Sequence, residues 1–195
     1  FKGYGGFPAA ACISVNDVVI HGIPSKKQIL RAGDIVSVDV GAYIDGFHGD
    51  TAFTFPVGEV SDAAGRLMDA TRESLYEVIG FLKEGVRIGD IGHAVESYVA
   101  ARGYSVVRDF VGHGVGRALH EDPGIPNYGR AGHGVRLMKG STVAIEPMVN
   151  EGTGKVSVDA DGWTTRTADG KLAAHFEHTF YIDTDGCRIL TDPED

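Results

Sequence analysis

Apolar and polar side chains alternate along residues 35–44 and again along 47–56, with Asp45-Gly46 between the two runs. An Asp-Gly pair in this setting predicts two antiparallel strands joined by a two-residue turn, with Ile44 opposite Phe47. Since strand side chains alternate between faces, each face collects its own set. The apolar face carries Val36, Val38, Val40, Phe47, Phe53 and Phe55. The other face carries Asp39, Gly41, His48, Asp50 and Thr54.

Two carboxylates therefore share one face of the predicted hairpin. Asp39 and Asp50 form a diagonal cross-strand pair, with their Cα atoms roughly 7 Å apart. Carboxylates at this spacing repel each other unless a proton or a cation lies between them. Solvent-facing acids on an exposed strand face are the alternative. A paired acidic face opposite a face patterned for a core favours a metal ion.

Two helices are predicted after the hairpin. Ser61 or Asp62 caps the first, which is expected to end at Gly85. Asp90 starts the second, and Gly103 supplies the left-handed residue at its end. The apolar positions recur at helical spacing: Leu67, Met68, Leu75, Val78, Ile79 and Leu82 in the first, and Ile91, Ala94, Val95, Tyr98 and Val99 in the second. Both helices are expected to cover a sheet, and Val36, Val38, Phe53 and Phe55 are expected to pack under helices.

The N-terminal part predicts a ring-bearing loop followed by a strand. Residues 1–12 are rich in glycine and aromatic residues, which is typical of a loop that forms a pocket wall. Residues 13–21 predict a strand interrupted at Asn16-Asp17, which places His21 at a strand end. Residues 104–111 predict a further strand.

The pattern of acids within apolar runs returns later in the chain. Residues 142–149 and 173–182 predict strands that contain Glu146 and Glu177. Charged residues are rare in strands and are almost never fully buried unless paired or bound to a metal. With His113, on a predicted turn between two glycines, the candidate ligands are Asp39, Asp50, His113, Glu146 and Glu177.

This donor set is rich in oxygen and has a single imidazole. Such sets favour Mn, Fe(II) or Co over the thiolate-rich sites of structural zinc. Four acids suit two ions, which at roughly 3.5–4 Å apart lower the pKa of a shared water and hold a hydrolysable carbonyl. The predicted reaction class is metal-assisted hydrolysis. For His113 a core histidine is the alternative, but its flanking glycines favour close backbone approach.

The other histidines divide into two groups. His120 follows His113 by seven residues, so a turn can return it to the same pocket, where it would donate a hydrogen bond to a developing oxyanion. A surface or supporting role is favoured for His21, His48, His133, His175 and His178. His48 shares the face of Asp50 and stays a candidate for lining the site.

Composition limits the class of protein. The chain has 195 residues, of which 43% are hydrophobic, enough for one domain or two packed halves. A net charge of −9 with scattered basic residues disfavours a nucleic-acid surface. Cys12 and Cys187 form no disulfide framework, and no apolar run reaches the roughly 18 residues of a membrane span, so a cytosolic location is expected. The chain starts at Phe1, and an upstream segment is expected.

The order of elements suggests one unit used twice. The second copy has two helices before its acid-bearing strands, whereas the first begins at a loop. We therefore expect two pseudo-symmetric halves, with the helices of the first half lying upstream. No sequence repeat supports this hypothesis directly.

Five motifs resemble those of the type I methionine aminopeptidases, M24-type metallopeptidases of the pita-bread fold. They are Ser-Val-Asp-Val-Gly at 37–41, Gly-Asp-Thr at 49–51, Gly-His-Gly-Val-Gly-Arg-Ala-Leu-His-Glu-Asp-Pro at 112–123, Ile-Glu-Pro-Met at 145–148 and Phe-Glu-His-Thr at 176–179. The resemblance spans essentially the whole chain. It implies an α/β (α+β) fold in which helices cover a curved antiparallel sheet, as a single domain over residues 1–195 with its first half truncated. The short spacing between His113 and Glu146 favours type I over type II.

The resemblance also implies roles for individual residues. Asp39, Asp50, His113, Glu146 and Glu177 would hold two metal ions, with Asp50 and Glu177 bridging. Glu146 would also shuttle the proton of the bridging water. His120 would contact the scissile carbonyl, and His21 the peptide nitrogen beyond it. The methionine pocket would be lined by Tyr4, Phe7, Cys12 and Trp163, while Leu119 stands where the family often has an aromatic ring.

The activity implied is removal of the N-terminal methionine from nascent proteins and peptides with a small second residue, by a bridging hydroxide between two divalent ions. The ions would be Mn, Fe(II) or Co, with Zn also accepted. The implied partners are nascent polypeptide N-termini, at the ribosome, with no nucleic-acid or membrane partner, and the protein would be a monomer. Two alternatives stay open: a proline-specific aminopeptidase P or prolidase, and a non-catalytic pita-bread binding module.

Overall fold

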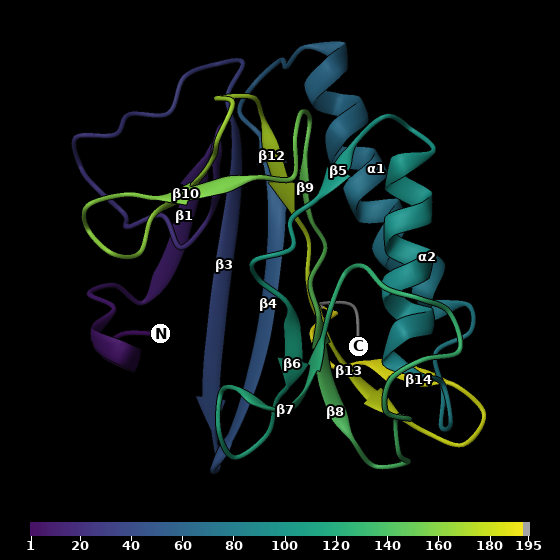
Figure 1. Ribbon diagram of the computed structural model, residues 1–195. Coiled ribbons are helices and arrows are strands. Elements are labelled where there is room, and N and C mark those ends of the chain that lie inside the picture. Colours follow the sequence, from purple (N-terminus) through teal and green to yellow (C-terminus); the bar gives the residue numbers. More distant parts are fainter. Residues whose placement is uncertain (193–195) are drawn as a thin grey trace.

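The computed structural model describes residues 1–192 as a set of antiparallel strands with two long helices (Figure 1). The helices are α1 (Asp62–Ile79) and α2 (Ile88–Ala100), and a 3₁₀ turn, η1, spans Tyr4–Gly6. The strands of the first half are β1 (Ala11–Val15), β2 (Val18–Ile20), β3 (Ile35–Ile44) and β4 (Phe47–Pro56). The later strands are β5 (Ser105–Val106), β6 (Gly112–Gly114), β7 (Glu121–Ile125), β8 (Thr142–Ile145), β9 (Met148–Asn150), β10 (Val156–Val158), β11 (Thr165–Thr167), β12 (Ala173–His175), β13 (His178–Ile182) and β14 (Cys187–Ile189).

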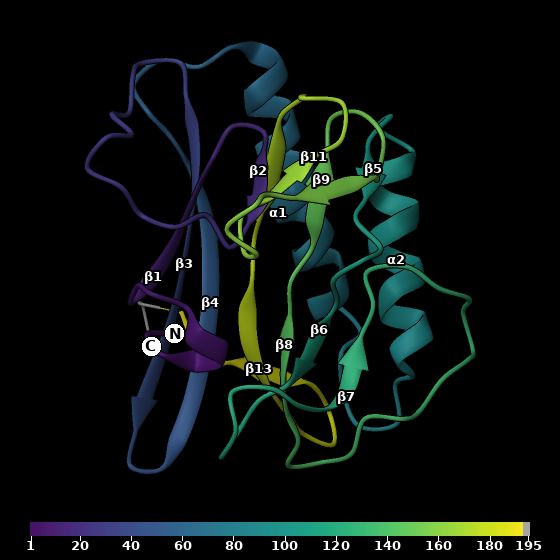
Figure 2. The ribbon, with the colours of Figure 1, turned by 60° about the vertical axis from the view of Figure 1, so that its left-hand side comes forward.

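Four antiparallel sheets form within residues 1–192, with strand orders β1-β3-β4, β10-β11-β2, β12-β9-β5 and β14-β13-β8-β6-β7. In Figure 1 α1 and α2 run side by side to the right of β9, and in both views the long β3–β4 ribbon lies to the left of the two helices (Figures 1 and 2). The apolar faces of the helices pack on β5, β7, β9 and β12 and enclose the main core. No helix in this part of the chain is long and apolar enough to cross a membrane.

The predicted hairpin is confirmed. β3 and β4 pair without a register shift down to Ile44 and Phe47, so Asp39 and Asp50 share a face on a diagonal. The turn residues have positive φ angles, 50° at Asp45 and 88° at Gly46. This is the backbone conformation that a two-residue hairpin turn needs, and glycine adopts it without steric cost.

The acidic face of the hairpin points inward, against the segment that carries Glu177. Ala52 and Glu177 exchange two backbone hydrogen bonds of 3.3 and 2.8 Å. Thr54 Oγ1 donates to His175 O at 2.8 Å and accepts from His175 N at 2.9 Å. These bonds satisfy the Thr54 hydroxyl and the backbone groups of Ala52, His175 and Glu177 in this buried seam.

The apolar face of the hairpin is only partly covered. Val36 is buried, and Phe53 is half-buried with its ring centroid 5.6 Å from that of Phe176. Phe55 is 50% exposed. Among residues 1–192, α1 and α2 lie mainly against other strands, so the expectation that these outer residues pack under helices stays a prediction for Phe55.

Both helices are confirmed, with shifted ends. Ser61 caps α1, its hydroxyl accepting from the backbone N–H of Ala64 at 3.2 Å. The helix ends at Ile79 rather than at Gly85, because Gly80 follows and glycine weakens a helix.

The second helix starts at Ile88, two residues before the predicted position. Asp90 is its third residue, and its carboxylate accepts from the N–H of Arg87 at 3.1 Å, so it caps the helix from within. The strand predicted at 104–111 is reduced to the two residues of β5.

Glu146 and Glu177 lie at breaks between strands rather than inside them. One break, between β8 and β9, falls at Glu146-Pro147, where proline has no N–H for a ladder. The other, between β12 and β13, falls at Phe176-Glu177. The β12–β9 pair on one side of the breaks and the β13–β8 pair on the other side have the same register. Glu146 therefore lies opposite Glu177.

His113 lies in strand β6, not on the predicted turn. The close backbone approach expected of its flanking glycines is confirmed. A Cβ atom on Gly112 would lie 2.3 Å from Ala144 O, and one on Gly114 would lie 2.4 Å from Asp122 O. Only glycine allows β7 and β8 to approach β6 this closely.

Candidate metal centre

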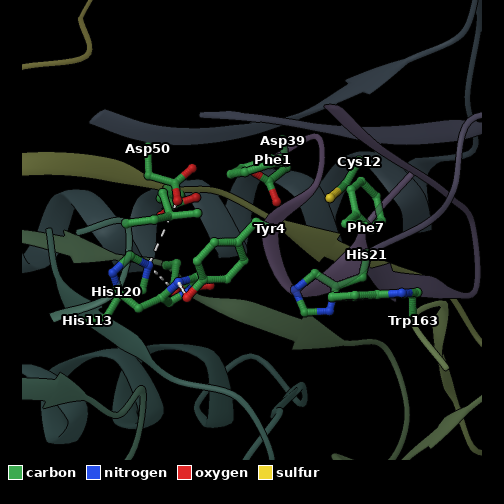
Figure 3. Close-up of a pocket in the computed structure, with 13 residues that line it drawn as sticks. Phe1, Tyr4, Phe7, Cys12, His21, Asp39, Asp50, His113, His120 and Trp163 are labelled. Atoms are coloured by element: carbon green, nitrogen blue, oxygen red, sulfur yellow. Dashed lines mark hydrogen bonds and ion pairs between the residues drawn. The ribbon is translucent and has the colours of Figure 1, made fainter. Parts of the chain in front are cut away.

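One cavity of about 300 Å³ collects every residue that the sequence singled out for the site. Figure 3 shows Asp50, His113 and His120 at one end and Cys12, Phe7, His21 and Trp163 at the other, with Asp39 and Tyr4 between them. Glu146 and Glu177 also line this cavity, as do Phe1 and Leu119, of which Leu119 was expected beside the methionine pocket. A charged end and an apolar end therefore share a single space.

The charged end is built from five separate segments of the chain. Asp39 comes from β3, Asp50 from β4, His113 from β6, and the two glutamates from the strand breaks. Asp50, His113 and Glu177 each offer a ligand atom within 4.8 Å of the others. His113 Nε2 lies 3.9 Å from Asp50 Oδ2 and 3.7 Å from Glu146 Oε1.

The ring of His113 is oriented by its own strand. Its Nδ1 lies 2.8 Å from Gly114 O, and a carbonyl can only accept, so Nδ1 carries the hydrogen. Nε2 then presents a lone pair to the carboxylate oxygens of Asp50 and Glu146. Lone pairs facing one another need a cation between them, and a backbone-anchored imidazole is a common metal ligand.

The four acids perturb one another strongly. Burial, with the charges of Asp39 and Glu146, raises the pKa of Asp50 to about 9. Burial raises the pKa of Asp39 to about 6 and that of Glu146 to about 7. Burial, followed by the neighbouring acids, raises the pKa of Glu177 well above its usual range. In the absence of a counter-charge this cluster retains protons at neutral pH.

Unsatisfied atoms at this end fit divalent cations. Within residues 1–192, Asp39 Oδ1 and Asp50 Oδ1 are buried without a hydrogen-bond partner. A buried unpaired acceptor costs about 1–3 kcal/mol, so native proteins rarely leave two side by side. Oxygen atoms of carboxylates with one imidazole nitrogen are suitable ligands for hard or borderline divalent ions.

His120 lies between the acids and Tyr4. Its ring centroid is 4.1 Å from that of His113 and 5.1 Å from that of Tyr4. Its Nδ1 lies 2.8 Å from the Tyr4 hydroxyl. Burial, then the nearby His113, lowers the pKa of His120 to about 4, so its imidazole is neutral at physiological pH.

His21 lies at the apolar end of the cavity, beside Trp163. It follows β2 with a φ of 57°, an uncommon conformation for a residue with a Cβ atom. Its ring meets those of Phe110 and Trp163 edge-on, at centroid distances of 5.5 and 6.1 Å. Burial lowers the pKa of His21 to about 4.

The apolar end is lined by rings and small groups. Phe7 and Trp163 pack edge to face with centroids 5.2 Å apart, and Phe7, Cys12 and Leu119 are buried. Burial, then the charge of Asp39, raises the pKa of the Cys12 thiol, so it stays protonated and acts as a small apolar contact.

Phe1 and His175 also lie near the site, and one candidate, His48, lies outside it. Phe1 packs on Gly41, where a Cβ atom would lie 2.6 Å from Phe1 Cε1. His175 Nε2 lies 3.5 Å from Glu146 Oε2. The spacing of His175 two residues before Glu177, which puts strand side chains on one face, is the signal that could have found it. His48 does not line the cavity; its ring lies 4.5 Å from that of Tyr43.

An acid-rich cavity in a curved antiparallel fold is typical of a metal-dependent hydrolase, and comparison with known proteins gives the class. Residues 2–184 match the model of metallopeptidase family M24. Methionine aminopeptidase of Clostridium acetobutylicum is 52% identical over 191 residues, covering 98% of this chain and 76% of that protein.

Solved structures of methionine aminopeptidases and of a more distant relative share the fold of this chain. The methionine aminopeptidase of Thermotoga maritima superposes with a TM-score of 0.97 at 54% identity, covering 98% of this chain and 77% of that one. An X-Pro aminopeptidase of the same organism shares the fold, with a TM-score of 0.73 at 20% identity, over 93% of this chain and 46% of its own. The chain belongs to metallopeptidase family M24 and, within it, to the methionine aminopeptidases of the pita-bread fold.

Proposed function

We propose that this enzyme removes the N-terminal methionine from peptides and nascent proteins whose second residue is small. The observation that carries the proposal is the single cavity in which the acidic cluster opens directly onto a ring-lined apolar end. A thioether side chain makes favourable contacts with aromatic rings, and a space of about 300 Å³ suits one such side chain beside the reacting groups.

Asp39, Asp50, His113, Glu146 and Glu177 would hold two divalent ions. The unpaired Asp39 and Asp50 oxygens and the lone pair of His113 support this assignment. When bound, such ions polarise a carbonyl and lower the pKa of a water towards neutrality. Mn, Fe(II) and Co suit this donor set, and Zn is a further candidate.

The side chains around the acids would carry the proton and hold the substrate. Glu146 accepts a proton from the attacking water and delivers it to the leaving amine as the C–N bond breaks. Tyr4 donates to His120 Nδ1, which leaves the Nε2 hydrogen of His120 to stabilise the developing oxyanion. His21 contacts the peptide nitrogen beyond the scissile bond. The methionine side chain lies among Tyr4, Phe7, Cys12, Leu119 and Trp163.

A peptide panel tests the substrate class. With Mn, Co or Fe(II), we expect cleavage of Met-Gly and Met-Ala peptides and no cleavage of X-Pro peptides, measured by release of the first residue. The reverse preference would assign the site to a proline-specific peptidase. Absence of any bound divalent ion after reconstitution would favour a non-catalytic binding module.

The metal ligands are tested by Asp39→Asn, which keeps the shape of the side chain and removes its charge. We expect turnover of a Met-Gly peptide to fall by at least about 100-fold, because the cation loses an anionic ligand. The circular dichroism spectrum should stay unchanged. Wild-type turnover at saturating metal would contradict the role of Asp39.

We further propose that the substrates are N-termini of nascent chains at the ribosome, in the cytoplasm, and that the enzyme acts as a monomer. The net charge of −9 supports a protein rather than a nucleic-acid substrate. Cross-linking to nascent chains and sedimentation of the purified protein test these points.

A further inference from the structure

A third imidazole lies beside the acids and has no part in the steps above. His175, at the end of β12, is 2% exposed, and its Nε2 is buried without a hydrogen-bond partner among residues 1–192. The carboxylate of Glu146 lies nearby, with Oε2 3.5 Å from this nitrogen. A buried polar atom that lies beside a carboxylate and lacks a hydrogen-bond partner among the described residues suggests that the pair forms part of the site.

Both partners are anchored through their backbones. Thr54 Oγ1 bonds to the N–H and to the carbonyl of His175, at 2.9 and 2.8 Å. Asn127 Nδ2 donates to the carbonyl of Glu146 at 2.9 Å. Two fixed segments thus bring the imidazole and the carboxylate together, so their approach is a property of the fold rather than of a mobile side chain.

The carboxylate of Glu146 lies between two different imidazoles. Oε1 is 3.7 Å from His113 Nε2, and Oε2 is 3.5 Å from His175 Nε2. His113 presents a lone pair, because its Nδ1–H is committed to Gly114 O. An Nε2–H on His175 would instead donate to Oε2, and this contact favours that tautomer.

We propose that His175 is a positioning residue for Glu146. Its Nε2–H holds Oε2, and this fixes the plane of the carboxylate so that Oε1 stays directed towards His113 and the other acids. Hydrogen bonds of catalytic groups are often long before substrate binds and shorten in the complex, which is consistent with 3.5 Å. The inference rests on the proposed roles of Glu146 as ligand and proton carrier.

Three substitutions at His175 distinguish the effect of its Nε2–H donor from the effect of the bulk of its ring. In His175→Gln the amide nitrogen is three bonds from Cβ, as Nε2 is in histidine. In His175→Asn it is one bond shorter, and His175→Leu keeps the bulk without a donor. We expect the Gln variant to retain kcat within about threefold, and the Asn and Leu variants to lose about 10- to 100-fold, as for other groups that orient metal ligands. KM should change little, because His175 does not line the cavity.

Metal affinity gives a readout that does not depend on turnover. Calorimetric titration of the metal-free protein with Mn or Co should give similar affinities for wild type and His175→Gln, and about tenfold weaker binding for His175→Leu and His175→Asn. This order tests His175 even if the wild-type protein fails to cleave Met-Gly peptides, so failure of the proposed function is recognised separately.

A second buried imidazole serves as the control. His178 bonds through Nδ1 to Thr191 Oγ1 at 2.8 Å and packs on Phe53. His178→Leu should lower the melting temperature while leaving kcat and metal affinity at wild-type values.

The proposal is overturned if His175→Gln is as impaired as His175→Leu, or if the His175→Asn and His175→Gln variants behave alike. A loss of one equivalent of metal in His175→Gln would also overturn it, since His175 would then be a ligand.

Discussion

Among individual residues, Tyr4 and His120 form a contact that can set which nitrogen of the His120 imidazole carries the hydrogen. A neutral imidazole carries one N–H, and the pKa of His120 is lowered to about 4, chiefly by burial. The Tyr4 hydroxyl, 2.8 Å from Nδ1, can donate to it and so keep the hydrogen of the ring on Nε2. Tyr4 therefore has a polar function beside its place in the apolar wall.

We predict that Tyr4→Phe lowers kcat/KM for Met-Gly peptides by up to about tenfold, the value of one neutral hydrogen bond. The pocket wall is kept, so KM should change less than kcat. Steady-state kinetics measure the effect. Tyr43→Phe is the matched control, since Tyr43 is exposed and outside the cavity. If Tyr4→Phe and Tyr43→Phe are equally active, the Tyr4 hydroxyl does not determine the tautomer of His120.

Among the elements, the β3–β4 hairpin was the most predictable from sequence. Alternation fixed its faces, and Asp45-Gly46 fixed its register, because a two-residue turn with positive φ allows only one pairing. The breaks at Glu146 and Glu177 were missed. Pro147 was a local signal for the first, whereas nothing in the sequence around Phe176 marks the second.

We predict that Gly46→Ala lowers the free energy of unfolding by about 1 kcal/mol, because φ at this position is 88° and a Cβ atom is strained there. Gly49→Ala, in the same hairpin, should be nearly neutral, because its Cβ atom would meet nothing within 4 Å. Urea unfolding with an unchanged m-value measures both. If both variants lose the same free energy of unfolding, the loss would come from placing alanine in the hairpin and not from the positive φ of the turn.

At the scale of the whole molecule, the acid cluster couples stability to pH and to metal. The pKa of Asp50 is raised to about 9 in the folded state, chiefly by burial, so at pH 7 the metal-free protein holds a proton that the unfolded chain has released; burial raises the pKa of Glu177 in the same direction. Stability must then fall as pH rises through the folded-state values. His21 and His120 do not oppose this above about pH 6.5, because they are neutral in both states there.

We predict that the metal-free protein melts at a lower temperature at pH 9 than at pH 7. The slope is at most about 1.4 kcal/mol per pH unit for each proton released. Saturating divalent metal should raise the melting temperature more at pH 9, because metal binds the deprotonated carboxylates. Thermal melts with chelator or metal measure this, and Asp50→Asn should flatten the metal-free profile. A metal-free profile that rises from pH 7 to 9 would contradict the prediction.

The sequence by itself determined the hairpin, the two helices and the residues of the site. Alternation, turn chemistry and helical spacing are local properties, and the acids stood out because charge inside an apolar run needs a reason. Only the tertiary structure decided that the acidic face of the hairpin points inward and that Glu146 lies opposite Glu177. It alone brought His175 against Glu146. These depend on packing between segments that are separate along the chain: 31 residues separate Glu146 from Glu177, and 121 separate Thr54 from His175. No local pattern encodes such contacts.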